Sequence, residues 1–147
     1  MMLETSGNAG IRKTRIVIDT SILISAVLVD GAYRKLLRKL LLTEFALYIP
    51  QEVLDEFEEK TQEQKFQKYR PFFTEILDEL HTSAIILPSA KQKRYMLKHC
   101  KEDEGIINCC VENVIDYLVT SDKRTVGKYN GLEVIFAQDF YYRFLTN

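Results

Sequence analysis

The sequence contains no apolar segment that approaches the roughly 18 to 20 residues needed to cross a bilayer. Its first ten residues, MMLETSGNAG, are polar and contain glycine, unlike the apolar core of a secretory signal. These two features argue against a membrane protein and against a secreted one. We therefore expect a cytoplasmic protein that does not bind a membrane.

Residues that form cross-links or bind soft metal ions are also scarce, because there are only three cysteines and two histidines. Cys100, Cys109 and Cys110 form no Cys-x-x-Cys pair, which argues against a disulfide framework and against a zinc knuckle. We expect all three to be buried, reduced thiols. The two histidines, His81 and His99, are expected to be structural or surface residues.

A chain of 147 residues can bury one core without cross-links, so we expect a flexible leader over residues 1–14 and a single domain over 15–147. Short apolar runs alternate with segments in which apolar residues recur every three or four positions. The runs predict strands at 15–19, 45–49, 84–87, 115–120 and 133–137. The periodic segments predict helices at 22–28, 33–41, 50–60, 61–83, 90–101, 103–114 and 139–145.

Alternating strands and helices predict an α/β fold, because parallel neighbours in a sheet need crossover helices between them. We expect a three-layer sandwich with a central, short-stranded parallel sheet flanked by helices. The segment 61–83 carries Pro71, and proline breaks or kinks the helix that precedes it. This segment is therefore expected to form a helical hairpin arm.

Two of the predicted strands end directly in acids. Ile16-Val17-Ile18 is followed by Asp19, and the strand 115–120 is followed by Ser121 and Asp122. The carboxyl ends of parallel strands line one crevice of a sheet, and a carboxylate next to buried apolar residues needs a partner or an ion. If the two strands are adjacent, Asp19 and Asp122 meet in that crevice. The alternative for Asp122 is a role in a turn or a helix cap.

Asp103, at the start of the predicted helix 103–114, and Glu56, on the helix 50–60, are candidates for the same crevice. Like charges at about 4 Å repel by on the order of 4 kcal/mol per pair at an effective dielectric near 20, so four carboxylates require a cation. Oxygen ligands of this kind suit Mg²⁺ or Mn²⁺, and such ions support phosphodiester cleavage, which indicates a nuclease. Taken singly, Asp103 is also explained as a helix N-cap and Glu56 as a surface acid.

Four stretches together resemble one known family. VIDTSILISAVL is similar to an opening strand that ends in Asp-Thr-Asn, and IPQEVLDEFEE is similar to a strand followed by a helix that carries an acid. DEGIINCCVENVIDYLVTSDK and EVIFAQDFYYRFL are similar to the later helices and strands. In this order, from residue 15 to residue 145, the chain resembles the PIN domain family, particularly the PIN-type toxins of toxin–antitoxin systems.

The resemblance implies a Mg²⁺- or Mn²⁺-dependent endoribonuclease with an RNA substrate, an antitoxin partner and a homodimeric state. The metal ligands and catalytic acids that it implies are Asp19, Glu56, Asp103 and Asp122, with Thr120 or Ser121 as a polar helper. Asn at position 19 or 122 is expected to abolish cleavage and to leave the fold intact or stabilised, because it relieves repulsion. Ser21 stands where the family has asparagine, and Glu102 or Glu104 could replace Asp103 if the register shifts.

Two other functions stay open. A strand-terminal Asp19-Thr20 also fits haloacid-dehalogenase-type phosphatases, although these carry a second aspartate where this chain has Ser21. A non-catalytic PIN-like module that binds RNA or a protein is the other alternative. The basic segments RKLLRKL and AKQKRYMLKHCK could hold RNA phosphates or be ordinary solvated helix faces. Tyr141 and Tyr142 are expected to pack the terminal helix rather than stack on bases.

Overall fold

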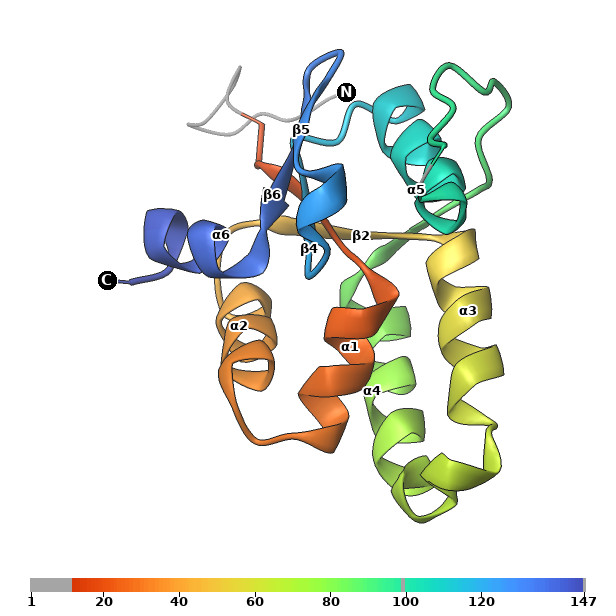
Figure 1. Cartoon of the computed structure of the whole chain (residues 1–147). Helices are drawn as coiled ribbons and strands as arrows, with labels where there is room; N and C mark the ends of the chain where they lie inside the picture. The colour runs from red at the N-terminus through yellow and green to blue at the C-terminus, as the bar shows by residue number, and fades with distance from the viewer. Residues whose placement is uncertain (1–11, 99, 147) are drawn as a thin grey trace.

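A six-stranded sheet forms the centre of the molecule, with strand order β3-β2-β1-β4-β6-β5 (Figure 1). The computed structural model describes residues 12–98 and 100–146, apart from the side chain of Glu102. The strands are β1 (Arg15–Ile18), β2 (Ala46–Pro50), β3 (Ile85–Leu87), β4 (Tyr117–Thr120), β5 (Gly127–Tyr129) and β6 (Leu132–Phe136). Every neighbouring pair is parallel except β5 and β6. The predicted α/β fold with a mostly parallel central sheet is confirmed.

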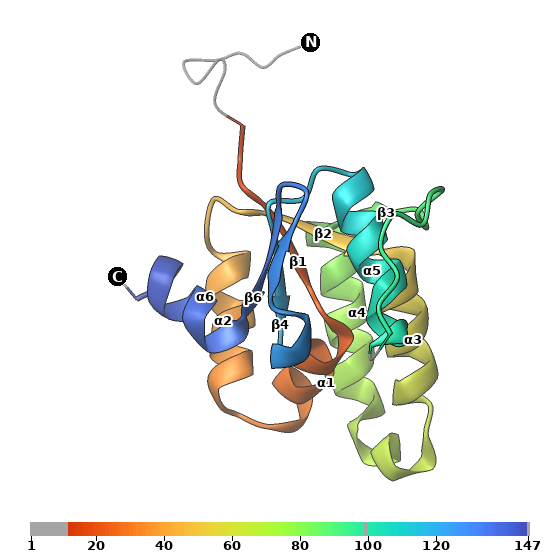
Figure 2. The same ribbon diagram turned by 45° about the horizontal axis from the view of Figure 1, so that its top comes forward.

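Helices flank this sheet and make the crossovers that parallel strands require (Figure 2). The α-helices are α1 (Thr20–Leu28), α2 (Ala32–Leu41), α3 (Gln51–Thr61), α4 (Arg70–Ser83), α5 (Lys101–Glu112) and α6 (Ala137–Phe144), and the short 3₁₀ turns are η1 (Gln64–Tyr69) and η2 (Lys123–Thr125). The middle strands are buried on both faces, as Ile16, Val17 and Val119 are fully shielded from solvent. Strands with apolar residues on both faces explain the continuous apolar runs in the sequence.

A helical arm is formed by α3, η1 and α4, which run down and back along one side of the molecule (Figure 1). Pro71 lies in the first turn of α4, where its missing N–H costs no helical hydrogen bond, so a new helix begins there. The ring of Phe73 lies 5.7 Å from that of Phe57 on α3 and 5.8 Å from that of Phe66 on η1. These edge-on aromatic contacts hold the two helices together. A helical hairpin arm is present as predicted, but its bounds differ from the predicted 61–83, because its first helix is α3 (Gln51–Thr61) and its second is α4.

The predicted helix over 90–101 is wrong, because its described residues 90–98 form an extended loop. Side chains of α5 bind the main chain of this loop. Glu112 accepts from the Lys91 N–H at 2.9 Å, and Asn108 accepts from the Tyr95 N–H at 2.9 Å and donates to the Tyr95 carbonyl at 3.0 Å. These bonds replace those that a helix would have supplied, so the segment has no need to coil.

The sequence-based prediction missed β5, which pairs with β6 in an antiparallel hairpin at the edge of the sheet. Asn130 and Gly131 form the turn, with φ values of 48° and 94°. An Asn-Gly pair is the preferred sequence for a two-residue hairpin turn, because both positions need a positive φ. This signal was present in the sequence.

The predicted leader, residues 1–14, is described only in part. Of the leader 1–14, residues 1–11 lie outside the described residues, as does His99. Arg12 donates two hydrogen bonds to the Asp116 carboxylate, at 3.1 and 2.9 Å, and the Thr14 carbonyl accepts from Ala46 N–H at 2.9 Å. The division into leader and domain stays a prediction. Among the described residues, no helix has the length and apolar character of a membrane span.

Candidate metal centre

The acids at the ends of β1 and β4 are neighbours, because these two strands are paired and parallel. Ile18 lies opposite Val119, and the Asp19 N–H donates to the Val119 carbonyl at 3.1 Å. Asp19, Thr120, Ser121 and Asp122 therefore gather at one edge of the sheet. This is the position at which ligands bind in parallel α/β folds.

The Asp19 carboxylate is 9% exposed and accepts four hydrogen bonds. One oxygen accepts from the Ile22 N–H and the Ser21 hydroxyl, both at 3.0 Å. The other accepts from the Thr120 hydroxyl at 2.8 Å and from the Ser121 N–H at 3.0 Å. Asp19 is thus the N-cap of α1. It joins the ends of β1 and β4 through its side chain.

Thr120 and Ser121 extend this network of hydrogen bonds. The Thr120 hydroxyl, which donates to Asp19, accepts from the Asp122 N–H at 3.0 Å. The Ser121 hydroxyl lies 2.6 Å from that of Ser21, the residue that stands in the place of the usual asparagine. Both predicted polar helpers therefore contact the acids or their neighbours, and Thr120 links Asp19 with Asp122.

Glu56 on α3 faces the same end of β1. One of its carboxylate oxygens accepts from the Thr20 hydroxyl at 2.7 Å, and the other pairs with the Lys60 ammonium at 3.0 Å, one turn further along the helix. Glu56 is therefore not the free surface acid of the alternative interpretation. It is connected to Asp19 through the neighbouring residue, Thr20.

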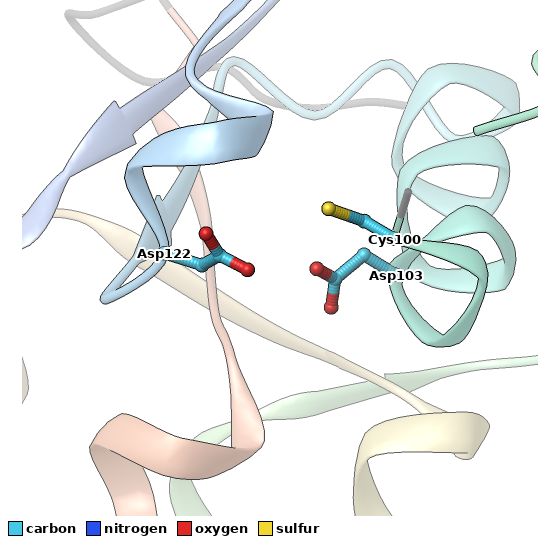
Figure 3. Close-up of side chains that lie close together, drawn as sticks. All are labelled: Cys100, Asp103 and Asp122. Atoms are coloured by element: carbon cyan, nitrogen blue, oxygen red, sulfur yellow. The ribbon is translucent and has the colours of Figure 1, made fainter. Parts of the chain in front are cut away.

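Asp103 and Asp122 approach each other together with Cys100 (Figure 3). Asp103 and Cys100 project from the start of α5, and Asp122 projects toward them from the loop after β4. One potential ligand atom from each lies within 4.8 Å of the others. These three residues, the Cys100 cluster, could hold a metal ion. Asp19 and Glu56 do not belong to this group, so their assignment as ligands stays a prediction.

A cation of the chain itself already contacts the Cys100 cluster. Arg124 donates from Nη2 to Asp122 at 2.7 Å and from Nε at 3.0 and 3.1 Å to the two carboxylate oxygens. These side-chain bonds, followed by the bond from the Arg124 backbone N–H, lower the pKa of Asp122 below its usual range. Asp122 therefore stays ionised at neutral pH, which a metal ligand requires.

Comparison with protein-family models assigns the chain to a family. A protein-family model of the PIN domain matches residues 15–124. The chain belongs to the PIN domain family. The matched region runs from β1 to η2 and includes all four predicted acids of this PIN domain. A comparison with curated proteins found no match.

Two solved structures share the fold of this PIN domain. One is the crystal structure of VapBC2 from Rickettsia felis bound to a DNA fragment from the VapBC2 promoter. It matches with a TM-score of 0.57 and 18% sequence identity, and the match covers 82% of this chain and 97% of that chain. PAE2754 from Pyrobaculum aerophilum has a TM-score of 0.53 and 15% identity over 89% of this chain and 88% of that chain. At these identities, the likeness establishes a common fold.

Sequence reasoning missed two residues near the site of the PIN domain, Cys100 and Glu52. Cys100 is the N-cap of α5 and precedes Asp103 by three positions. This spacing puts both side chains on the same face of the helix. The incorrect helix prediction over 90–101 hid this signal. All three cysteines are buried and outside any disulfide, and of the three Cys100 joins the acids.

Glu52 lies one helical turn before Glu56 on α3, and the two acids have different partners. Glu52 packs against Gly105 of α5, whereas Glu56 accepts from Thr20 of α1. A side chain at Gly105 would put its Cβ 3.3 Å from a Glu52 oxygen, so the glycine lets this acid pack against α5. The other Glu52 oxygen is buried without a hydrogen-bond partner among the described residues. Burial, and then the Glu52 charge, raise the pKa of the Cys109 thiol to about 12.

The flanking acids give no support to a shifted register at Asp103. Glu104 turns away from the Cys100 cluster and accepts from the Leu97 N–H at 3.1 Å. The side chain of Glu102 lies outside the described residues.

The donor chemistry of the PIN domain fits a divalent cation. Asp103 and Asp122 supply the carboxylate oxygens that Mg²⁺ and Mn²⁺ prefer, and Asp19 and Glu56 add negative charge at the same edge. Cys100 adds a softer sulfur ligand, which Mg²⁺ does not favour and which transition metals accept. The arrangement can concentrate positive charge at the carboxyl ends of β1 and β4.

Proposed function

We propose that this PIN domain is a divalent-metal-dependent endoribonuclease that acts as the toxin of a toxin–antitoxin system. The observation that carries the proposal is the approach of Asp103 and Asp122 to each other at the edge of the sheet where β1 and β4 end. The buried Asp19 lies at the same edge and accepts from Ser121, the residue before Asp122. Membership of the PIN domain family supports a nuclease, and the likeness to VapBC2 supports an antitoxin partner.

In this proposal, Asp103 and Asp122 hold a Mg²⁺ or Mn²⁺ ion, with Asp19 and Glu56 as the remaining acids of the site. When bound, the ion supplies the positive charge that phosphodiester hydrolysis requires. Thr120 positions both Asp19 and the main chain of Asp122, at 2.8 and 3.0 Å. Ser121 donates its backbone N–H to Asp19, which fixes the loop that carries Asp122. The homodimeric state and the cytoplasmic location belong to the same proposal.

A non-catalytic PIN-like module is the second candidate, and specific contacts favour it. Asp122 is neutralised by Arg124, Glu56 by Lys60, and Asp19 accepts four internal hydrogen bonds. A site satisfied in this way could persist without a metal. Nothing in the geometry favours the phosphatase alternative, and the family match gives it no support.

Calorimetric titration of Mn²⁺ into metal-stripped protein separates the two candidates. We expect saturable binding to the wild type and its loss in the double variant Asp103→Asn with Asp122→Asn. Asp55→Asn is a matched control, because Asp55 lies exposed on α3 and, among the described residues, accepts a hydrogen bond from the Gln51 side chain alone. Equal binding by the wild type and the double variant would leave the acids a structural role and favour the non-catalytic module.

Cleavage of RNA tests the catalytic part of the proposal. The wild type and Asp55→Asn should cut a single-stranded RNA in the presence of Mn²⁺, and the double variant should not. Expression of the wild type should arrest growth of the host, and expression of the double variant should not. RNA cleavage by a well-folded double variant would contradict the assignment of these acids.

A further inference from the structure

A groove lies between α2 and α6, where β6 ends. Its volume is about 350 Å³, and its polar and aromatic lining comes from Tyr33, Lys35, Phe136, Gln138, Tyr141 and Tyr142. Both views of the fold show α2 and α6 side by side (Figures 1 and 2). Because α6 begins directly after β6, the groove opens at the same edge of the sheet as the acids. Most of it lies beyond residue 124, where the family match ends.

The groove and the candidate metal centre are linked through Phe136, which lines the groove. Phe136 lies opposite Thr120 in the pairing of β6 with β4, and Thr120 donates to Asp19. The Lys123 ammonium lies 4.8 Å from the centroid of the Phe136 ring. Lys123 directly follows Asp122 in the chain, so it joins the Cys100 cluster on one side to the groove on the other. An RNA strand that is bound at the acids and passes over Lys123 would therefore reach the groove next.

The charge of this surface suits a polyanion. The helix α2 carries Lys35 and Lys39 on the side of this groove, whereas its Arg34 and Arg38 line another hollow together with Asp30 and Glu75. Its two lysine ammonium groups lie 5.7 and 5.1 Å from the centroid of the Tyr141 ring. Lys39 also donates to the Leu145 carbonyl at 2.7 Å, which fixes it at the end of α6. Among the described residues that line the groove, Lys35 brings a positive charge and none brings a negative one.

The aromatic part of the groove is open to solvent. Tyr142 is 65% exposed, so the prediction that it only packs the terminal helix is wrong. Its ring meets that of Tyr141 edge-on, with centroids 6.1 Å apart and planes at 88°. Tyr141 is thus occupied by the lysines and by its neighbour, whereas Tyr142 presents its ring to solvent.

We propose that the α2–α6 groove binds an unpaired base of the RNA substrate, with the base stacked on Tyr142 and an adjacent phosphate held by Lys35. Proteins bind single-stranded nucleic acids through aromatic rings beside a positively charged surface. The two lysines that α2 places at the groove favour a phosphate backbone over an apolar protein segment. This inference rests on the proposed ribonuclease function and adds a binding site for the strand outside the catalytic acids.

Fluorescence anisotropy with a 5′-labelled, unstructured RNA of roughly 12 nucleotides tests the inference, with EDTA present to prevent cleavage. Tyr142→Ala should weaken binding about five- to one-hundredfold, the range typical of one lost base-stacking contact. Tyr142→Phe retains the ring and should bind like the wild type. Lys35→Gln should reduce the slope of log affinity against log salt by about 0.7, the effect of one phosphate contact on a single strand.

Lys13→Gln is the charge-matched control, because Lys13 is exposed just before β1, at the opposite edge of the sheet. If the wild type binds RNA and both Tyr142→Ala and Lys35→Gln bind it equally well, the groove assignment is overturned and the ribonuclease proposal stands. The same conclusion follows if Lys13→Gln lowers the salt slope as much as Lys35→Gln. A wild type that neither binds nor cuts RNA overturns both proposals.

Discussion

Replacing Asp19 by asparagine should destabilise the fold, contrary to what the clustering of acids in the sequence suggested. The sequence-based expectation rested on repulsion between carboxylates, which the loss of one charge would relieve. In the structure, Arg124 pairs with Asp122 at 2.7 Å and Lys60 pairs with Glu56 at 3.0 Å. The nearest negative charges are thus partly neutralised, so little repulsion remains to be relieved.

The cost arises from the two backbone N–H groups that Asp19 accepts on different oxygens, those of Ile22 and Ser121. An asparagine has one oxygen and one NH₂ group, so one of these donors would face another donor. The hydroxyls of Ser21 and Thr120 can rotate, but a backbone N–H cannot. Losing a bond to a charged acceptor and leaving a buried donor unpaired together cost about 2 to 4 kcal/mol.

Thermal and urea unfolding, followed by circular dichroism in EDTA, measure this effect. For a chain of this length, we expect the melting temperature of Asp19→Asn to fall by roughly 5 to 15 °C. Asp55→Asn, at an exposed position on α3, should change the free energy of unfolding by less than about 0.5 kcal/mol. An Asp19→Asn protein that melts at or above the wild-type temperature would refute the assigned structural role of the four hydrogen bonds.

Other consequences concern Arg124 and the cysteines. Arg124→Gln should strengthen Mn²⁺ binding about two- to fivefold in calorimetry, because an exposed ion pair that competes for Asp122 is lost, and weaker binding would contradict this competition. Because the fold lowers the pKa of Asp122, the pair stabilises the protein above the unfolded pKa, and this contribution is lost as the pH falls through the folded pKa. The stability difference between the wild type and Arg124→Gln should therefore stay constant from about pH 7 to pH 5 and shrink as the pH falls below about 4 in urea titrations, and a difference that stays constant in acid would argue against the pair. Cys109 and Cys110 should resist a thiol reagent in the native protein at neutral pH and react in urea, since burial raises the pKa of both thiols. Cys100→Ser should weaken binding of Cd²⁺ more than that of Mg²⁺ in competition titrations, and an equal effect on both would remove the sulfur from the ligand set.

The sheet and most helices could be predicted because their signals are local. A run such as Ile16-Val17-Ile18 is apolar on both faces only where a strand is covered by helices on both sides. The loop 90–98 could not be predicted in this way, since its conformation depends on Glu112 and Asn108, which follow it on α5. Contacts of this kind leave no periodic pattern in the sequence.

The candidate site was predictable in part for the same reason. Asp19 and Asp122 are recognisable because each follows an apolar strand, and adjacent parallel strands bring their ends together. The roles of Glu52 and Cys100 depend on how α3 and α5 lie against the sheet and against each other. The Arg124 contact is local in sequence, yet a carboxylate two residues from an arginine is too common to predict an ion pair at a metal site.

The pairing of β1 with β4 determines when the site can form during protein synthesis. Thr120 and Asp19 lie 101 positions apart in the chain, yet their side chains are in direct contact. A ribosome releases the first of these strands long before the second exists, and domains fold as units once their parts are available. Incomplete chains that end before β4 therefore lack both Asp122 and the hydroxyl that orders Asp19. A cell that makes this protein is exposed to the assembled acidic site only after translation has passed Asp122.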